Sequence, residues 1–272
     1  MTNEFIKLDI QSGIATIYLN RPEKRNAFSD DMRGEYIEVL REVGSDRGVR
    51  AVVLTGNGKG FCAGGDVEGM QKRMRADPGE VGFNGWARQQ GVHQCVSLLH
   101  SMSKPTIAAV NGAASGLGAD TAISCDFVLA SGQASFTWSY IARGLIPDGG
   151  GMYLLPRRVG LAKAKDLIFS GRRVDAAEAL QLGIADRVVE HEALLPSAWR
   201  WAEALGKGSA TALALGKTIL NQTFELSAAQ VFAQGSQAQA VCYTTREHRE
   251  SVQAFLEQRD GRRGAAATGG KA

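Results

Sequence analysis

The first hundred residues contain segments with strand-like spacing of apolar residues and segments with helical spacing. Apolar and polar residues alternate over 4–20 around a Gln-Ser-Gly sequence, which predicts a β-hairpin. Residues 30–43 carry apolar side chains at helical spacing. Residues 49–56 are apolar almost throughout, as in a buried strand of a parallel sheet. A glycine-rich sequence, 57–70, then leads into a predicted helix, and a further helix is expected over 86–102.

The same order of strand, glycine-rich loop and helix then repeats. A strand is predicted at 106–112, and the residues after the loop, 119–125, predict a helix of small residues. Short strands are expected at 127–131 and 134–138, and a loop at 144–151 opens a helix over 154–159.

Helices dominate the predicted C-terminal third. A helix at 175–183 has Asp175 as its N-cap, Glu178 completing a capping box, and Gly183 as its stop. The other predicted helices cover residues 192–206, 209–223 and 227–258.

The repeated unit at 51–70 and 106–125 predicts one α/β domain with a helical extension. We expect an α/β core over residues 1–200 and a helical region over 201–260. The low-complexity residues 261–272 are expected to form a disordered tail.

Composition narrows the functional classes. The 272 residues carry a net charge of only +3, without a block of like charge, which argues against a nucleic-acid partner. The N-terminus lacks the apolar core of a signal peptide and no segment approaches a membrane span, so we expect a cytoplasmic protein without membrane contact. The four cysteines are scattered, which favours reduced thiols in the core. The four histidines lack paired ligand spacing, so no metal site is expected.

Two glycine-rich loops are the strongest candidates for chemistry. Three glycines fall within residues 112–118, and Gly64 and Gly65 lie in the other loop. Each loop precedes an expected helix, whose first N–H groups have no partner within the helix. Two such loops could place two donors around one oxygen, as an oxyanion requires. The alternative for either loop is a tight turn without a ligand.

Five sequences in order carry a resemblance to a known family: "RPEKRNAF", "VLTGNGKGFCAGGD", "KPTIAAVNGAASGLGAD", "GLIPDGGG" and "AAEALQLGIADRVV". Over about residues 5–260 the chain resembles the enoyl-CoA hydratase/isomerase (crotonase) superfamily. The resemblance implies a crotonase-like fold of repeated β-β-α units with a helical C-terminal extension. It also implies an acyl-CoA substrate, no separate cofactor, and a homo-trimer or dimer of trimers built with the C-terminal helices.

The resemblance assigns candidate binding residues by position. The thioester oxygen would lie between the N–H groups of Gly65 and Leu117. Lys24, Arg25 and Ala27 would follow the CoA nucleotide, and the alternative for the two cations is a solvated basic loop. The candidate substrate-binding set also includes Ala63 and Asp66, which flank the glycines of the first loop.

Three positions bear on the reaction. Hydratases of the family use two glutamates, where this chain has Asp120 and Tyr140. Several isomerases carry an acid at the position of Asp148. A carboxylate there can take a proton from one carbon and return it to another. We therefore predict that the enzyme shifts a double bond through Asp148, with Asp120 sharing the proton transfer. Hydration through Asp120 is the second hypothesis. The alternatives are a helix N-cap for Asp148 and a hydrogen-bonded polar residue at a helix start for Asp120.

A third hypothesis is a dehalogenase- or hydrolase-like reaction on an aromatic acyl group. In a dehalogenase of the superfamily, an Asp at the position of Asp148 attacks the ring, and His93 here would activate water. The alternative is that His93 is simply a polar residue on a partly buried helix. Trp86, Trp138 and Tyr140 would line the acyl pocket, or else pack in the core. A non-catalytic or RNA-binding role is the least favoured hypothesis.

Overall fold

The computed structural model describes residues 4–268 and the side chains of residues 4–259. The chain forms two compact units, which divide between Lys207 and Gly208. We predicted a boundary after residue 200, which falls inside helix α8 (Leu194–Gly206). The first unit extends to Lys207 and therefore contains the whole of α8.

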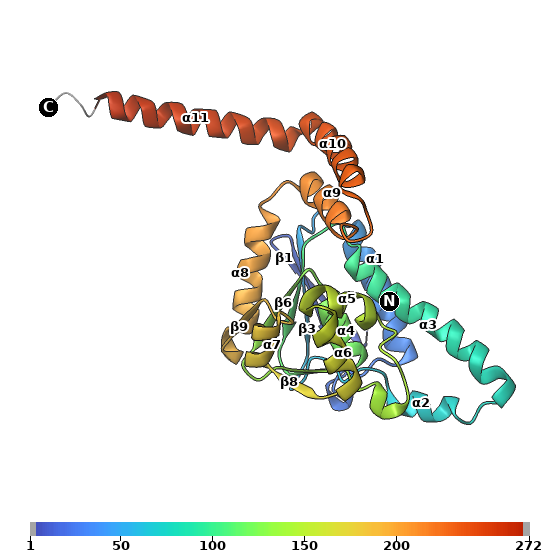
Figure 1. Cartoon of the computed structure of the whole chain (residues 1–272). Coiled ribbons are helices and arrows are strands. Elements are labelled where there is room, and N and C mark those ends of the chain that lie inside the picture. The colour runs from blue at the N-terminus through green and yellow to red at the C-terminus, as the bar shows by residue number, and fades with distance from the viewer. Residues whose placement is uncertain (1–3, 269–272) are drawn as a thin grey trace. The chain divides into compact units, whose positions relative to one another are not determined.

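A six-stranded sheet forms the centre of the first unit (Figure 1). Its order is β1-β2-β3-β4-β6-β9, and only β1 and β2 pair antiparallel, through the predicted hairpin. The strands are β1 (Ile6–Gln11), β2 (Ile14–Leu19), β3 (Ala51–Gly56), β4 (Thr106–Val110), β6 (Phe127–Ser131) and β9 (Arg187–Val189).

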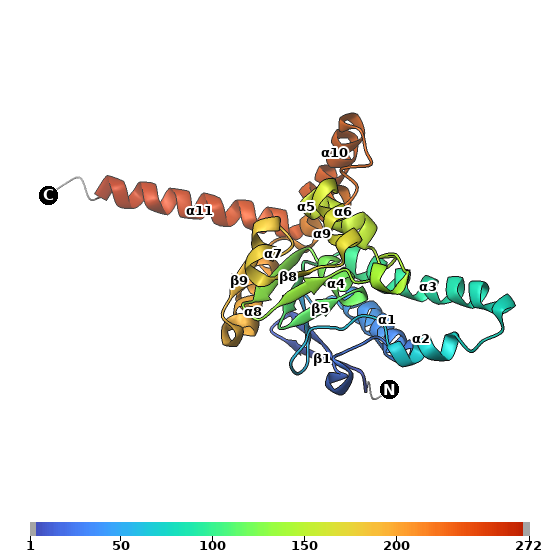
Figure 2. The same cartoon turned by 60° about the horizontal axis from the view of Figure 1, so that its bottom comes forward.

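Helices cover both faces of this sheet, which explains why β3 and β4 are apolar at nearly every position. Val53 and Ile107 pack with α8, whereas Leu54 and Ala108 belong to the larger core on the opposite face. That larger core includes side chains of α1 (Asp30–Ser45) and α3 (Pro78–His100), which run side by side (Figures 1 and 2).

A second, three-stranded sheet, ordered β5-β7-β8, supports the glycine-rich loops (Figure 2). It contains β5 (Ala113–Ser115), β7 (Ser135–Thr137) and β8 (Arg173–Asp175). With helix α4 (Leu117–Ile123), the order β4-β5-α4 is a β-β-α unit, and β6-β7-α5 (Gly151–Val159) repeats it.

In the first unit, the sequence-based prediction missed the start of one helix and the whole of another. Helix α3 begins at Pro78 instead of residue 86; most positions in 78–85 are exposed, so no apolar periodicity marks them. Helices α2 (Val67–Arg73) and α6 (Leu161–Ser170) also belong to this unit, and α6 was not predicted. Short helices and exposed helical turns have too few buried apolar residues to show the helical periodicity of the sequence.

Helix α7 (Ala176–Leu182) has the predicted cap residue but not the predicted use of Glu178. Asp175 accepts a hydrogen bond from the Glu178 N–H (2.9 Å), and Gly183 ends the helix at a φ of 82°. The Glu178 carboxylate forms an ion pair with Arg172 (2.7 Å). In a capping box the Glu178 carboxylate would accept a hydrogen bond from the backbone N–H of Asp175. Here the ion pair with Arg172 takes the place of that hydrogen bond.

The second unit contains α9 (Ala210–Leu220), α10 (Ala228–Thr244) and α11 (Arg246–Thr268). We predicted one helix over 227–258, but the backbone at Thr245 is extended. The Thr245 hydroxyl accepts a hydrogen bond from the His248 N–H (3.1 Å), so Thr245 begins a new helix. Residues 261–268 belong to α11, whereas disorder was expected from residue 261; residues 269–272 lie outside the described residues.

Within residues 4–268, no helix combines the length and apolar character needed to span a bilayer. The side chains of Cys62, Cys95 and Cys125 are buried, as predicted for core thiols.

Candidate active site

The two glycine-rich loops pack directly against each other. The N–H of Ser115 donates to the carbonyl oxygen of Cys62 (2.9 Å). A Cβ at Gly118 would lie 2.2 Å from that same oxygen, and one at Gly112 would lie 2.2 Å from the carbonyl oxygen of Lys59. The close approach that these glycines permit is therefore made by the backbone of the first loop, and it fixes the two loops relative to each other.

This packing brings two backbone donors to one place. Leu117 is the first residue of α4, and Gly116 before it has a φ of 52°. A Cβ at Gly64 would lie 3.4 Å from the Leu117 nitrogen, so the loops meet beside this N–H group. Within the described part of the chain, the N–H groups of Gly65 and Leu117 have no hydrogen-bond acceptor. Both residues line the same cavity, as the prediction of an oxyanion site requires.

That cavity is small, about 80 Å³, and Ala63, Ser115, Ser139 and Tyr140 also contribute to its wall. It shares Val67, Met70, Arg143 and Leu145 with a larger cavity of about 570 Å³. The two cavities therefore adjoin, and a ligand held at the backbone donors can extend into the larger one.

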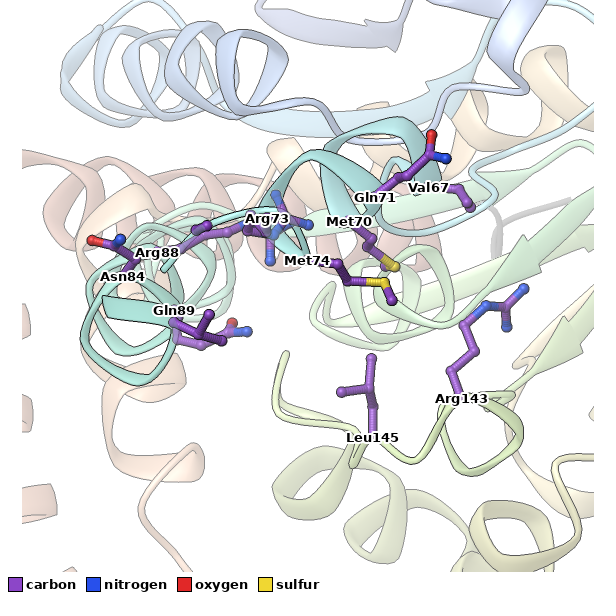
Figure 3. A pocket seen from close by; sticks show the side chains of 13 residues that line it. Val67, Met70, Gln71, Arg73, Met74, Asn84, Arg88, Gln89, Arg143 and Leu145 are labelled. Atoms are coloured by element: carbon purple, nitrogen blue, oxygen red, sulfur yellow. The ribbon is translucent and has the colours of Figure 1, made fainter. Parts of the chain in front are cut away.

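The larger cavity lies between α2, α3 and the loop after β7 (Figure 3). Its apolar side chains are Val67, Met70, Met74, Ala76, Val81 and Leu145. Its polar side chains are Gln71, Asn84, Gln89 and the three arginines Arg73, Arg88 and Arg143. Among the described residues that line it, there is no aspartate or glutamate.

Asp120 is fully buried and its carboxyl group is surrounded by donors. Trp138 Nε1 donates to Oδ1 (2.8 Å), the Tyr140 hydroxyl donates to Oδ2 (2.6 Å), and the Gly151 N–H also donates to this carboxyl. Burial raises the pKa of Asp120 to about 7. The hydrogen bonds from Tyr140 and Trp138 act to lower this pKa, whereas the negative charge of Asp148 helps to raise it. Tyr140 lines the small cavity, so Asp120 adjoins it through the tyrosine hydroxyl.

Asp148 is half-buried in the loop before α5. The N-cap of α5 is Gly150, so the alternative of Asp148 as a helix N-cap is wrong in this structure. Burial raises the pKa of Asp148, while its own backbone N–H and the charges of His93 and Arg88 oppose that rise. Asp148 follows Leu145, which lines both cavities, but it is not among the described residues that line either one.

The residues assigned to the CoA nucleotide lie on one edge of the first loop. Lys24 is exposed and pairs with Glu68 of α2. Arg25 is also exposed, in a left-handed conformation with a φ of 50°, and its carbonyl oxygen accepts the N–H of the exposed Ala63 (2.9 Å). Ala27 is buried. Lys24 and Arg25 can therefore meet an anion from solvent.

Asp66 has a structural role that the sequence did not indicate. Its carboxylate is buried and accepts Arg21 Nη1 at 2.6 Å, and it also caps α2 by accepting the Glu68 N–H (2.9 Å). Although burial acts to raise the pKa of Asp66, the hydrogen bond and charge of Arg21 hold it below its ordinary value. With these partners Asp66 holds the first loop in place.

Of the three aromatic residues that we predicted to line the acyl pocket, Tyr140 lines the small cavity. Trp138 is fully buried behind Asp120 and lines neither cavity among the described residues. Trp86 is 62% exposed and contacts Phe83, because it lies on the face of α3 away from the larger cavity. His93 is exposed on α3, where its charge acts on Asp148.

The sequence analysis missed the arginines of the larger cavity. Arg73 belongs to α2, Arg88 to α3, and Arg143 to the turn after β7. No motif joins these positions, because their proximity depends on the turn between α2 and α3. The charge balance gave no signal either, because residues 67–91 carry three arginines and three carboxyl residues.

Comparisons with known proteins agree on one family. A family model described as "Enoyl-CoA hydratase/isomerase" matches residues 9–263. The chain is 35% identical to the "1,2-epoxyphenylacetyl-CoA isomerase" of Escherichia coli (strain K12), covering 94% of this chain and 97% of that protein. It is 33% identical to the "Crotonyl-CoA hydratase" of Syntrophomonas wolfei, covering 95% and 97%. A crystal structure of an enoyl-CoA hydratase/isomerase from Cupriavidus metallidurans CH34 superposes with a TM-score of 0.88 at 34% identity, covering 95% of each chain.

Proposed function

Since the chain belongs to the enoyl-CoA hydratase/isomerase family, we propose that it shifts a double bond in an unsaturated acyl-CoA thioester. The thioester oxygen accepts hydrogen bonds from the N–H groups of Gly65 and Leu117, which stabilise the enolate that forms when the substrate loses a proton. The observation that carries this proposal is the pair of unpartnered N–H groups at one cavity.

Asp148 is the base in this mechanism. Its carboxylate removes a proton from a carbon conjugated with the thioester. The C–H electron pair forms a new C=C bond, and the electron pair displaced from the carbonyl double bond comes to lie on the thioester oxygen. The protonated Asp148 then returns that proton to a different carbon, the electron pair leaves the oxygen, and the double bond lies one position along the chain. The raised pKa of Asp148 supports this role, because a base with a pKa nearer to neutral pH also returns the proton readily.

Asp120 positions Tyr140 in this scheme. The Asp120 carboxyl group is fully buried, accepts from Trp138 and Tyr140, and is not among the described residues that line either cavity. The Tyr140 hydroxyl does line the cavity, and the hydrogen bond to Asp120 sets its orientation.

Hydration is the second candidate function. The similarity to a protein named as a crotonyl-CoA hydratase favours it, as does the pKa of about 7 for Asp120. A hydratase mechanism needs a water molecule held between acid and base groups, which here would be Asp148 and the Tyr140–Asp120 pair.

The substrate's CoA portion is assigned to the exposed side of the first loop, where Lys24 and Arg25 meet its phosphates. The assembly is proposed to be a trimer or a dimer of trimers built with the C-terminal helices. Exposed apolar side chains on α10 and α11, such as Phe232 and Phe255, support an interface there.

Labelled water distinguishes the two reactions. The enzyme is incubated with 2-enoyl- and 3-enoyl-CoA thioesters in D₂O or in H₂¹⁸O, and products are analysed by mass spectrometry. Isomerisation gives interconversion of the two series with deuterium gain and no oxygen gain. Hydration gives an ¹⁸O-labelled hydroxyacyl-CoA, and in that case the isomerase proposal is wrong. Absence of any exchange or product over the whole series contradicts both.

A further inference from the structure

The guanidinium group of Arg88 lies beside one of the two backbone donors. Arg88 belongs to α3 and lines the larger cavity, as does Arg73 of α2 (Figure 3). A Cβ at Gly65 would lie 3.9 Å from Nη2 of Arg88 and 3.0 Å from the Cε of Met70, a residue that both cavities share. The guanidinium group therefore lies close to Gly65, where the two cavities adjoin.

One carboxylate holds this guanidinium group in place. Nε of Arg88 donates to Oδ1 of Asp30, the first residue of α1, at 3.3 Å. The same oxygen accepts Nη2 of Arg33 at 2.6 Å. Among the residues whose side chains the structure describes, the two Nη nitrogens of Arg88 have no hydrogen-bond acceptor. The Arg88 side chain is only 15% exposed, so this charge has few solvent contacts and few protein partners.

Positive charge exceeds negative charge around Arg88. Asp30 is 65% exposed, so water weakens its interaction with Arg33 and Arg88. Burial lowers the pKa of Arg88, and the charges of Arg73 and Arg33 lower it further, against the opposing effect of Asp30. Since no aspartate or glutamate is among the described residues that line the larger cavity, a negative charge that forms beside Arg88 is attracted to it.

We propose that Arg88 is a third component of the oxyanion site, and that its positive charge stabilises the enolate oxygen held by the N–H groups of Gly65 and Leu117. The inference rests on the proposed function, because the enolate forms only when a thioester oxygen binds at these donors. The two N–H groups orient the oxygen, and the guanidinium group adds the full positive charge that neutral amides lack. A charge in a partly buried wall acts more strongly than the same charge in water.

The interaction with Arg88 grows as the proton is transferred. Before the transfer the negative charge lies on Asp148, and no ion pair joins Arg88 to Asp148 within the described residues. When Asp148 takes the proton, the negative charge moves to the thioester oxygen, beside Gly65 and the neighbouring guanidinium group. An interaction that strengthens on the way to the transition state accelerates the reaction, whereas one of constant strength does not.

The groups around Asp148 add a pH-dependent readout. Burial raises the pKa of Asp148, and the charges of His93 and Arg88 on α3 act to lower it, while Asp148 itself acts on Asp120 and Tyr140. Removing the charge of Arg88 therefore raises the pKa of Asp148, so this base becomes ionised only at higher pH. The acid limb of the pH–rate profile should move to higher pH. On the upper plateau Asp148 is ionised with or without Arg88, so a lower plateau rate does not come from its ionisation.

Exchange of substrate α-protons with D₂O tests the inference on the full-length protein. The rate is followed by mass spectrometry from pH 5 to pH 10 with 3-enoyl-CoA thioesters of six to twelve carbons. Arg88→Met keeps much of the side-chain length and removes the charge. It should lower the plateau rate by about 10- to 100-fold, as expected for the loss of one partly buried charge, and move the acid limb to higher pH. Arg88→Lys keeps a positive charge and should recover part of the lost plateau rate.

Two controls separate this role from binding and from general charge effects. Isothermal titration calorimetry with octanoyl-CoA, whose neutral thioester oxygen carries no full charge, should give the same affinity for wild type and Arg88→Met. Arg41→Met is the matched variant, because Arg41 is an exposed arginine of α1 that pairs with Glu38 and is not among the described residues that line either cavity. It should leave the plateau rate and the pH profile unchanged, and melting temperatures should show that all three variants fold.

The outcomes separate this inference from the proposed function. If the wild-type protein exchanges no α-proton in any of the thioesters, the proposed function is wrong and the inference fails with it. Wild-type exchange with an unchanged plateau rate in Arg88→Met overturns the inference alone. Equal losses in Arg88→Lys and Arg88→Met, or weaker octanoyl-CoA binding that accounts for the loss, also overturn it. A lower plateau in Arg88→Met, recovery in Arg88→Lys and unchanged binding support it.

Discussion

At the scale of single residues, the two carboxyl groups near the small cavity differ in how much of their hydrogen-bonding capacity is already used. Asp120 has no exposed surface and accepts from Trp138 and Tyr140. Asp148 is half-buried, and both His93 and Arg88 influence it. A base must present a lone pair to the carbon that it deprotonates, and this difference is our reason for proposing Asp148 as the base.

The first prediction compares the two carboxyl groups. Asp148→Asn keeps the size of the side chain but cannot accept a proton, so it should lose most exchange of substrate α-protons with D₂O while still binding acyl-CoA. Asp120→Asn should reduce exchange less, because the tyrosine hydroxyl still lines the cavity. Proton exchange is followed by mass spectrometry. Wild-type exchange in Asp148→Asn together with none in Asp120→Asn would move the mechanism to Asp120.

The second prediction concerns stability and pH. Because the folded protein raises the pKa of Asp120 from 3.8 to about 7, the folded state binds its proton more tightly than the unfolded state does. The free energy of unfolding therefore falls as the pH rises from about 4 to about 7, by at most about 4 kcal/mol from this group.

Asp120→Asn removes that titration. Urea unfolding at pH 5 and pH 8, at one protein concentration, should show that wild-type stability falls more between these pH values than the stability of Asp120→Asn. Asp148, whose pKa is also raised, titrates in both proteins, so the difference between them reports Asp120 together with its coupling to Asp148. Equal pH dependence in the two proteins would contradict an elevated pKa at Asp120.

At the scale of elements, the packing of the two glycine-rich loops creates the donor pair. The first loop precedes α2 and the second precedes α4, and each contributes one N–H group. Neither loop alone offers two converging donors, so the site depends on the short-range contact between Cys62, Ala114 and Gly118.

The third prediction removes one donor. Leu117 is the first residue of α4, a position where proline is tolerated because its missing N–H leaves no helical hydrogen bond unmade. Leu117→Pro should therefore fold and lower turnover by about 10²–10³-fold. Leu117→Ala is the control, since it loses the same side chain and keeps the N–H. Near-normal turnover in a folded Leu117→Pro variant would show that Leu117 is not a donor to the substrate.

The fourth prediction tests the loop packing. Gly118→Ala places a Cβ 2.2 Å from the Cys62 carbonyl oxygen, so it should destabilise the protein by at least about 1–3 kcal/mol. Gly34→Ala in α1 is the control, because no atom lies within 4 Å of a Cβ there. It should stabilise by about 0.5–1 kcal/mol, through the better helix propensity of alanine. Thermal or urea unfolding measures both, and equal effects would contradict the packing argument.

At the scale of the whole molecule, the first unit contains all the candidate site residues. The second unit exposes large apolar side chains instead. Phe224, Phe232, Tyr243 and Phe255 are between 59% and 74% exposed. Surfaces of this kind are typical of protein interfaces, so the second unit is the part of the chain that we expect to form the oligomer.

The fifth prediction concerns the C-terminal residues. Residues 261–272 consist of Gly, Ala, Arg, Lys and Thr and have no large apolar side chain to bury. Truncation after Asp260 should therefore leave the oligomer mass and the melting temperature unchanged within error. Light scattering and calorimetry measure them. A smaller oligomer or a clear loss of thermal stability would show that the last residues contact a neighbouring subunit.

Much of the fold was predictable because its signals are local. Alternation gave the hairpin of β1 and β2, and continuous apolar runs marked β3 and β4 as strands covered on both sides. The α/β class with repeated β-β-α units and the family were both confirmed. The division of the 227–258 segment was missed, since it depends on the hydroxyl of Thr245 and not on a change of period.

The sequence alone determined strands β1–β4, β6 and β7, most of the helices and the positions of the two glycine-rich loops, because local spacing encodes these directly. The candidate carboxyl groups came from the family resemblance. Only the tertiary structure decided which polar groups meet. It paired Asp66 with Arg21, enclosed Asp120 between Trp138 and Tyr140, and brought Arg73 beside Arg88. The physical reason is that hydrogen bonds and desolvation act between segments that are distant in sequence, and their partners exist only after the chain has folded.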